Sequence, residues 1–322
     1  AAWLGLKACW LKLETMHPTG TFKDRITELT YAFFRQEGVA CYSHCSAGNT
    51  ATSLVWGLKR YARPFALHLF VAEEQLPYHN FQSDPALRVT LLAGAGYQQA
   101  KRYAAWYARS IGQPEHFGFN SPVRQEGNKL PYLEALAQCR RERIEPDLIC
   151  QVISDGSGTK GAALAAADAL AAGWLKRQPA LCAFQPAAAN PMVRAFRSGR
   201  STYDHSCDAE LQPSKASFIR RSDASGSYEA VYQAVSQSGG FLEDAAEGEI
   251  EAARQALMGL EGINAGYTSC VALAGLKKRA AADQALAGVS ALVMLTGIDR
   301  QAVAFAPADE ILPREAWQKV IG

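Results

Sequence analysis

The segment "HPTGTFKDR" (residues 17–25) joins a strand-like stretch at residues 8–14 to a stretch with helical spacing. The helical pattern continues to Gly38, where it stops. Asp24 in the first turn suits the positive end of the helix dipole. Lys23 therefore lies at a strand-to-helix junction, where a side chain projects from a rigid support. Taken alone, the segment is also consistent with an ordinary surface lysine.

Strand-like and helix-like patterns alternate along the rest of the chain, which predicts an α/β fold of mostly parallel sheets flanked by helices. The predicted strands are residues 39–45, 65–71, 88–93, 148–153, 180–185, 216–220 and 289–295. The predicted helices are residues 26–37, 50–61, 97–111, 128–143, 160–173, 226–238, 247–260 and 266–281. We expect two lobes that share a cleft: a smaller one at 25–118, and a larger one formed by 1–24 and 119–322. The loop-rich stretches 73–87 and 198–215 are candidates for mobile segments near a site.

Composition describes an ordinary globular protein of 322 residues, with 48% hydrophobic and 20% charged residues. The net charge of +2 and the absence of a basic run with interleaved aromatics give no support for nucleic-acid binding. No apolar stretch reaches the roughly 18–20 residues that a membrane span needs.

The eight cysteines lack C-x-x-C spacing and several lie in apolar runs, which indicates reduced thiols of a cytoplasmic protein rather than disulfides or a metal site. Because the chain opens without methionine, we expect that a stretch precedes Ala1 in the natural protein.

Three further turns follow predicted strands, which is where ligands bind in open α/β sheets. They are "SAGNT" (46–50), "SDGSGTKG" (154–161) and "TG" (296–297). The glycine-rich "DGSGTKG" leads into a helix start, where backbone N–H groups and the hydroxyls of Ser157 and Thr159 could hold a phosphate. The sequence is neither a P-loop nor a dinucleotide fingerprint, and a flexible glycine turn is the alternative. A phosphate site together with a junction lysine suggests an aldehyde cofactor that forms a Schiff base.

These four motifs, in this order from about residue 8 to 300, resemble those of fold-type II pyridoxal-phosphate enzymes, in particular the threonine synthase and cysteate synthase group. The resemblance implies a two-lobed fold of the tryptophan synthase β type with pyridoxal 5'-phosphate between the lobes, in the larger, cofactor-binding lobe. It also implies small-molecule partners, an amino acid and a small nucleophile, and a homodimer.

By the same resemblance, Lys23 is the catalytic lysine that carries the cofactor. Asn49 would bind the cofactor's ring oxygen, and Thr296 would face its pyridine nitrogen. The cofactor's phosphate would be held by Gly156, Ser157, Gly158 and Thr159. The substrate carboxylate would be held by Ser46, Ala47, Gly48 and Thr50.

A neutral hydroxyl at Thr296 does not keep the pyridine nitrogen protonated as a carboxylate would. It therefore favours elimination and replacement at the β carbon over transamination. Lys23, once released from the cofactor, is placed to remove the α proton and later return it. The expected reaction is loss of the α proton, departure of a β leaving group, and addition of a nucleophile to the resulting aminoacrylate.

The substrate is indicated by "FGFNSPVRQEGNKLPYLEAL" (117–136), which departs from threonine synthases because Gly118 and Phe119 replace an Asn-Ser pair. Asn120 and Arg124 resemble the substrate-binding "NxxRxxG" run of cysteate synthases. That closer match implies O-phospho-L-serine as substrate and sulfite as nucleophile, with Arg124 binding the leaving phosphate. His44 and Cys45 are interpreted as packed, non-catalytic side chains.

Three alternatives remain open at the level of sequence. The first is a threonine synthase that acts on O-phosphohomoserine, and the second is a serine or threonine dehydratase that eliminates without adding a nucleophile. The third is a catalytically silent regulator that binds pyridoxal phosphate without turnover. Retention of Lys23, Asn49, the phosphate turn and Thr296 argues against the third.

Overall fold

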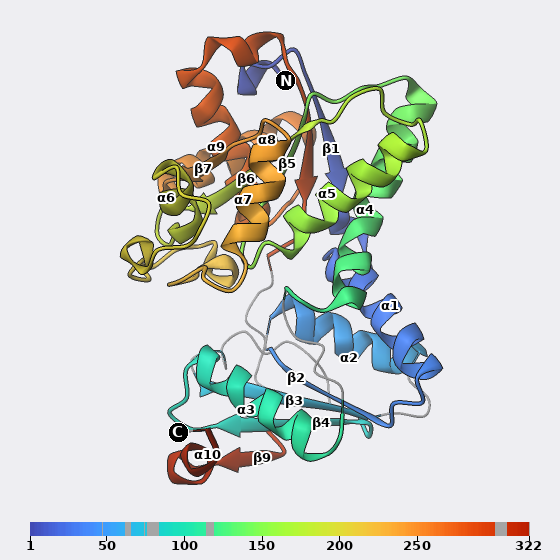
Figure 1. Cartoon of the computed structure of the whole chain (residues 1–322), viewed down its shortest axis with the longest axis vertical. Helices are drawn as coiled ribbons and strands as arrows, with labels where there is room; N and C mark the ends of the chain where they lie inside the picture. Colours follow the sequence, from blue (N-terminus) through green and yellow to red (C-terminus); the bar gives the residue numbers. More distant parts are fainter. Residues whose placement is uncertain are drawn as a thin grey trace. The chain divides into compact units, whose positions relative to one another are not determined.

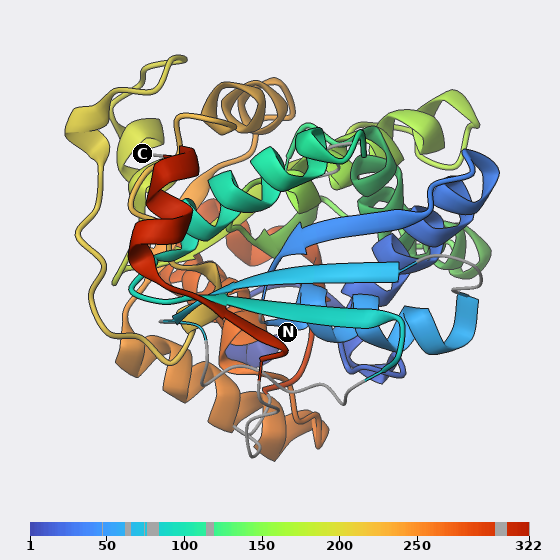
Figure 2. The same ribbon diagram turned by 90° about the horizontal axis from the view of Figure 1, so that it is seen from below.

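The computed structural model describes residues 1–46, 48–61, 66–73, 75, 84–113, 119–299 and 308–321. The chain forms two compact units (Figures 1 and 2). Unit 1 contains residues 1–16 and 128–299, and unit 2 contains residues 17–127 and the segment from residue 300 onwards. Part of the predicted loop 73–87 lies outside the described residues.

Unit 1 is built on a five-stranded parallel sheet of order β1-β8-β5-β6-β7. Its strands are β1 (Ala8–Leu13), β5 (Leu148–Val152), β6 (Ala180–Pro186), β7 (Leu242–Ala245) and β8 (Ser290–Leu295). Its helices are α5 (Ser157–Ala171), α6 (Pro191–Arg197), α7 (Tyr228–Gln237), α8 (Glu247–Glu261) and α9 (Tyr267–Ala282). Short 3-10 helices are η1 (Ala2–Leu4), η2 (Glu14–Met16), η4 (His205–Cys207), η5 (Ser217–Ile219) and η6 (Gln284–Gly288).

Apolar side chains cover both faces of this sheet, as expected for buried parallel strands. On one face Cys150, Phe184 and Val293 pack with residues of α8 and α9. On the other face Ile149 and Leu292 pack with residues of α4 (Pro122–Glu142) and α5.

Unit 2 contains a second parallel sheet of order β2-β3-β4-β9. Its strands are β2 (Cys41–Cys45), β3 (Ala66–Ala72), β4 (Leu87–Leu92) and β9 (Glu310–Leu312). Its helices are α1 (Lys23–Gln36), α2 (Asn49–Tyr61), α3 (Tyr97–Ser110) and α10 (Arg314–Ile321), together with the first residues of α4. Residues of α1 and α2 pack on one face of the sheet, and residues of α3 and α10 pack on the other. Figure 2 shows β2, β3 and β4 running side by side.

The predicted α/β class with parallel sheets is confirmed, but two elements differ from their predicted form. The sequence predicts a strand at residues 216–220, where the structure has η5. The strand that completes this edge of the sheet is β7, whose sequence "LEDA" is too polar to read as a buried strand. Its two carboxylates are tolerated at the sheet edge because Arg197 and Lys278 form ion pairs with both of them.

The C-terminal segment lies in unit 2, whereas the sequence places it with the larger lobe. The short strand β9 pairs with β4 in parallel, and Trp317 of α10 is 1% exposed. The indole Nε1 of Trp317 donates to the carbonyl of Ala93 at 3.0 Å. A three-residue strand with an exposed Ile311 carries no periodic signal, so only the tertiary pairing reveals it.

A matched pair of glycines tests how closely α9 packs on the sheet of unit 1. A Cβ added to Gly275 would lie 2.4 Å from Cδ1 of the buried Phe184, whereas one added to Gly259 in α8 would meet nothing within 4 Å. Gly275→Ala should therefore lower the free energy of unfolding by about 1–3 kcal/mol. Gly259→Ala should leave it unchanged or raise it by about 0.5–1 kcal/mol. Urea unfolding followed by circular dichroism measures both, and equal effects of the two substitutions would contradict this packing.

Candidate active site

Lys23 is the first residue of α1, and the turn before it is locked by hydrogen bonds. The amide of Gly20, at φ +69°, donates to the carbonyl of His17 at 2.8 Å. The buried carboxylate of Asp24 accepts the backbone N–H of Thr19 at 2.9 Å and also its hydroxyl. Because Asp24 bonds the turn to the helix start, the backbone of Lys23 is held from both sides. The half-buried Lys23 side chain places its Nζ 4.2 Å from the ring centroid of Phe22.

The "SAGNT" segment follows β2 at its carboxyl end and opens α2, as the sequence predicts. The carbonyl of Gly48 accepts the amide of Thr52 at 3.1 Å and its hydroxyl at 3.3 Å. Asn49 is therefore the first helical residue rather than the cap, and its side chain is not needed to end the helix. Ser46, Asn49 and Thr50 are all partly exposed, while Ala47 lies outside the described residues.

Arg124 lies in the first turn of α4, and not on a loop as the sequence suggests. The predicted helix starts at residue 128 because Gly127 and Pro131 read as helix breakers. In the structure Gly127 instead allows α1 to approach, since an added Cβ would lie 2.7 Å from Cα of Ile26. Arg124 is 7% exposed, whereas Asn120, before the helix, is exposed.

The positive charges of unit 2 converge on His44, which is 5% exposed near the carboxyl end of β2. Burial holds the pKa of His44 well below its ordinary value, and the charges of Arg124, Lys101 and Lys23 lower that pKa further. The Nδ1 atom of His44 lies 3.1 Å from the hydroxyl of Tyr42. His44 is therefore a neutral, packed side chain amid three cations, which supports its exclusion from the catalytic set.

In unit 1 the predicted phosphate turn and Thr296 follow neighbouring parallel strands. β5 pairs with β8, so that Cys150 lies opposite Val293. From β5 the chain continues to β6 and β7 on one side, and β8 returns on the other side, so the strand order reverses between β5 and β8. Ligands of open α/β sheets bind at such reversal points, outside the carboxyl ends of the strands.

The turn before α5 can hold an anion, but with fewer donors than the sequence suggests. Gly156 has φ +84° and precedes the helix, which leaves the N–H groups of Gly158 and Thr159 without an intrahelical acceptor. The sequence predicts that Ser157 donates to the phosphate. Its amide and hydroxyl instead donate to Oδ1 of Asp155, at 3.0 and 2.6 Å. The donors that fit a phosphate here are therefore the N–H groups of Gly158 and Thr159 and the Thr159 hydroxyl.

Thr296 is 6% exposed and is supported by Ser269 of α9, which the sequence analysis did not single out. The Ser269 hydroxyl donates to the carbonyl of Gly297 at 2.8 Å and accepts its amide at 3.0 Å. It also lies 3.4 Å from the Thr296 hydroxyl. A serine near the start of an apolar helix carries no sequence signal, since only the fold brings it beside residue 296.

The thiols offer no candidate nucleophile. All eight cysteines are free, and burial raises the pKa of Cys45 to about 12. A buried thiol of this kind is inert, as predicted. Among the residues that the structure describes, no group of three or more His, Cys, Asp or Glu could hold a metal ion. The same residues contain no helix long and apolar enough to cross a membrane.

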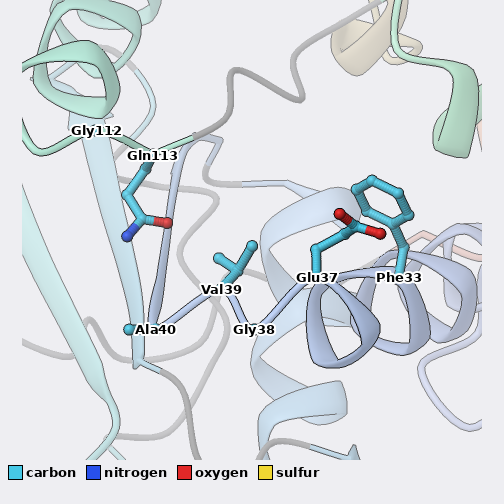
Figure 3. A pocket seen from close by; sticks show the side chains of 7 residues that line it. All are labelled: Phe33, Glu37, Gly38, Val39, Ala40, Gly112 and Gln113. Carbon is cyan, nitrogen blue, oxygen red and sulfur yellow. The ribbon is translucent and has the colours of Figure 1, made fainter.

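A cavity of about 390 Å³ in unit 2 lies away from these residues (Figure 3). It is lined by Phe33, Glu37, Gly38, Val39, Ala40, Gly112 and Gln113. Ala40 immediately precedes β2, so this cavity is at the amino end of the strand, whereas Ser46 follows its carboxyl end. The cavity is therefore not part of the candidate site.

The chain belongs to the pyridoxal-phosphate-dependent enzyme family, whose model matches residues 1–297. Pyridoxal 5'-phosphate is accordingly the cofactor. Its aldehyde and phosphate match the two kinds of group described above, a lysine on a rigid turn and a helix start with available N–H donors.

Known proteins similar to this chain include threonine synthases and other enzymes of the same fold. The chain is 26% identical to threonine synthase of Halalkalibacterium halodurans over 308 residues, covering 91% of this chain and 77% of that protein. It is 26% identical to threonine synthase of Methanosarcina acetivorans, covering 85% of this chain and 66% of that protein. A solved threonine deaminase structure, from the source abbreviated "T.th.", superposes with a TM-score of 0.72 at 19% identity, covering 94% of this chain and 90% of that chain. Maize serine racemase gives a TM-score of 0.70 at 18% identity, covering 94% and 85%. At these identities the two structures establish the fold alone.

The buried, neutral His44 should make stability depend on pH. The pKa of His44 is depressed in the folded state, so unfolding binds a proton below the ordinary histidine value of about 6.5. Stability is then fully present above about pH 6.5 and falls by about 1.4 kcal/mol per pH unit below it. His44→Gln should remove this part of the slope, measured as urea unfolding free energies at a series of pH values.

His68 provides a positive control, since burial lowers its pKa to about 4. His68→Gln should flatten the pH dependence of stability in the same way. An unchanged slope in His44→Gln, with a flattened slope in His68→Gln, would contradict the neutral state of His44.

Proposed function

We propose that this protein catalyses β-replacement on an O-phosphorylated amino acid, O-phospho-L-serine, with sulfite as the nucleophile. The reaction breaks the Cβ–O bond, releases inorganic phosphate with the bonding electron pair, and forms a Cβ–S bond to sulfite. The α proton leaves before the phosphate and is returned afterwards, so atoms and charge balance without an oxidant or reductant. This is the reaction expected of a cysteate-synthase-like enzyme.

The observation that carries this proposal is the placement of Arg124. A cation in the first turn of a helix lies at the positive end of the helix dipole, which disfavours it by about 0.3–1 kcal/mol. Arg124 is also buried, and it acts on His44 together with Lys23 and Lys101. Burial of a cation beside two others is costly unless an anion joins them. A phosphorylated substrate supplies that anion, whereas serine or threonine does not.

The cofactor, when bound, supplies the electron sink that accepts the electron pair of the α C–H bond. We assign Lys23 to hold the cofactor, to remove the α proton at its Nζ, and to return it. Arg124 binds the phosphate of the substrate through its guanidinium and stabilises that phosphate as it departs. The start of α2, with Ser46, Gly48 and Thr50, binds the substrate carboxylate by its backbone N–H groups and hydroxyls.

Further cofactor contacts are assigned to residues of both units. Asn49 would bind the ring oxygen, and Thr296 would face the pyridine nitrogen. The phosphate is assigned to the start of α5, where Gly158 and Thr159 carry the available donors.

A threonine synthase acting on O-phosphohomoserine is the second candidate, because the curated relatives reported above carry that name. It uses the same leaving group and the same arginine. The sequence favours the shorter substrate, since Phe119, a buried aromatic side chain, stands in place of one residue of the polar Asn-Ser pair of threonine synthases. A dehydratase is disfavoured because it has no use for the buried cation.

Product analysis with four substrates tests the proposed reaction. The holoprotein is offered O-phosphoserine, O-phosphohomoserine, O-acetylserine and serine, each with and without sulfite, and released phosphate and amino-acid products are measured. We expect phosphate and cysteate from O-phosphoserine with sulfite, and no product from Lys23→Ala in any reaction. Threonine from O-phosphohomoserine alone would make the protein a threonine synthase. Pyruvate without any trapped product would make it a dehydratase.

Removal of the Arg124 guanidinium tests the role of that residue in the reaction. Loss of a charge-assisted phosphate contact costs about 1.5–3 kcal/mol, so Arg124→Ala should slow turnover of O-phosphoserine about ten- to a hundredfold. The visible spectrum of the bound cofactor should not change, since Arg124 is not assigned a cofactor contact.

Arg141→Ala is the matched control, because Arg141 is exposed on the same helix. It should turn over at the wild-type rate. Equal turnover by the two alanine variants would remove Arg124 from the site.

A further inference from the structure

Gln151 is a buried polar residue of β5 that the reaction proposed above does not use. It is 4% exposed, and it points to the same face of the sheet as Ile149 and Ile153, which pack in apolar clusters. Its amide lies directly against the start of α5. A Cβ added to Gly158 would lie 2.3 Å from its Nε2 and 2.8 Å from its Oε1.

The Gln151 amide also bonds to the hydroxyl of the next residue along α5. Its Nε2 donates to Oγ1 of Thr159 at 3.4 Å. A hydroxyl that accepts this hydrogen bond keeps its own proton for another acceptor. Gln151 therefore touches Gly158 and Thr159, the two residues whose donors fit an anion, and orients the one rotatable donor among them.

The cost of burying this amide indicates that Gln151 does more than fill the core. Its Oε1 has no hydrogen-bond partner among the residues that the structure describes. A buried acceptor of this kind costs about 1–3 kcal/mol, and valine or leucine would fill the same sheet position without that cost. Unsatisfied buried groups in folded proteins call for an explanation, and function is a common one.

We infer that Gln151 is a positioning residue for the phosphate of the cofactor: its amide orients the Thr159 hydroxyl toward the phosphate and requires glycine at position 158. The inference rests on the proposed placement of that phosphate at the start of α5. It does not depend on the identity of the substrate. Gln151 acts through Thr159 and Gly158 rather than by contact with the reacting atoms.

Binding of two cofactor forms to the apoprotein tests this inference without any measurement of activity. Pyridoxal 5'-phosphate and pyridoxal share the aldehyde and ring, but only the first carries the phosphate. Gln151→Met keeps the size of the side chain and removes its hydrogen bond. It should weaken binding of pyridoxal 5'-phosphate about tenfold, by loss of an oriented hydrogen bond to a charged group. It should change binding of pyridoxal less than about twofold, because pyridoxal makes no contact with the phosphate turn.

A double substitution tests whether the effect passes through Thr159. Thr159→Val should weaken binding of pyridoxal 5'-phosphate at least as much as Gln151→Met, and the double variant should bind no more weakly than Thr159→Val alone. Additive losses would overturn the inference. Wild-type affinity in Gln151→Met, or an equal loss for both cofactor forms, would overturn it as well.

Gln185 of β6 is the matched control, since it is a fully buried glutamine whose Nε2 also lacks a partner among the described residues. Its Oε1 accepts the backbone N–H groups of Met192 and Val193 at the start of α6. Gln185→Met should leave the ratio of the two cofactor affinities at its wild-type value. A change of that ratio equal to the one in Gln151→Met would show a general effect of buried amides and overturn the inference.

The steric part of the inference has its own test, which also applies if Gln151→Met does not fold. Gly158→Ala should weaken binding of pyridoxal 5'-phosphate, because the new methyl group collides with the Gln151 amide. Combining it with Gln151→Ala provides room for that methyl group and should recover part of the lost affinity. No recovery would overturn the steric role. Failure of the substrate experiments above leaves these binding results readable, since they use the cofactor alone.

Discussion

The parallel pairing of β5 with β8 is the contact on which the cofactor half of the site depends. Because the two strands run in the same direction, the turn before α5 and Thr296 emerge at the same edge of the sheet, from strands roughly 4.8 Å apart. An antiparallel β8 would place Thr296 at the opposite edge. The order of the sheet also requires β8 to return past β5, which leaves an open position above both strand ends. The site in unit 1 is thus a consequence of topology before it is a consequence of any side chain.

Unit 2 contributes charge rather than topology. Its sheet order follows the chain from β2 to β4, with β9 added at the edge, so it contains no reversal. What distinguishes this unit is the convergence of Lys23, Lys101 and Arg124 near His44. A protonated histidine among them would add a fourth positive charge in a buried place, and burial together with these charges keeps it neutral. The cluster therefore keeps its positive charge available for an anion.

Sequence reasoning predicts the locally determined parts of this structure. The turns at Lys23, Asn49 and Gly156 fall at strand-to-helix junctions as expected, because the residue types that form such turns are set by short-range backbone geometry. Long periodic helices, such as those at 97–111 and 247–260, are also predicted within a residue or two.

The parts that sequence reasoning misses depend on contacts between distant segments. The first turn of α4 reads as a loop because Gly127 looks like a breaker, whereas the fold uses it as the point where α1 approaches. Ser269 and Gln151 lie in apolar surroundings, and their roles appear only when α9 and α5 are in place. The burial of Glu243 and Asp244 in β7 likewise depends on Arg197 and Lys278, which lie 34 or more residues away.

On the proposed assignment, the protein holds two phosphates by different means, and the chemistry explains the difference. The cofactor's phosphate keeps the same charge throughout the reaction, so fixed N–H dipoles at the start of α5 and an oriented hydroxyl are sufficient to hold it. The substrate's phosphate gains negative charge as the Cβ–O bond breaks. A group that must favour the departing state over the bound ester has to respond to that gain, and a guanidinium in a buried site does so more strongly than a neutral dipole. A cation buried at the unfavourable end of a helix is therefore better suited to the leaving group than to the cofactor.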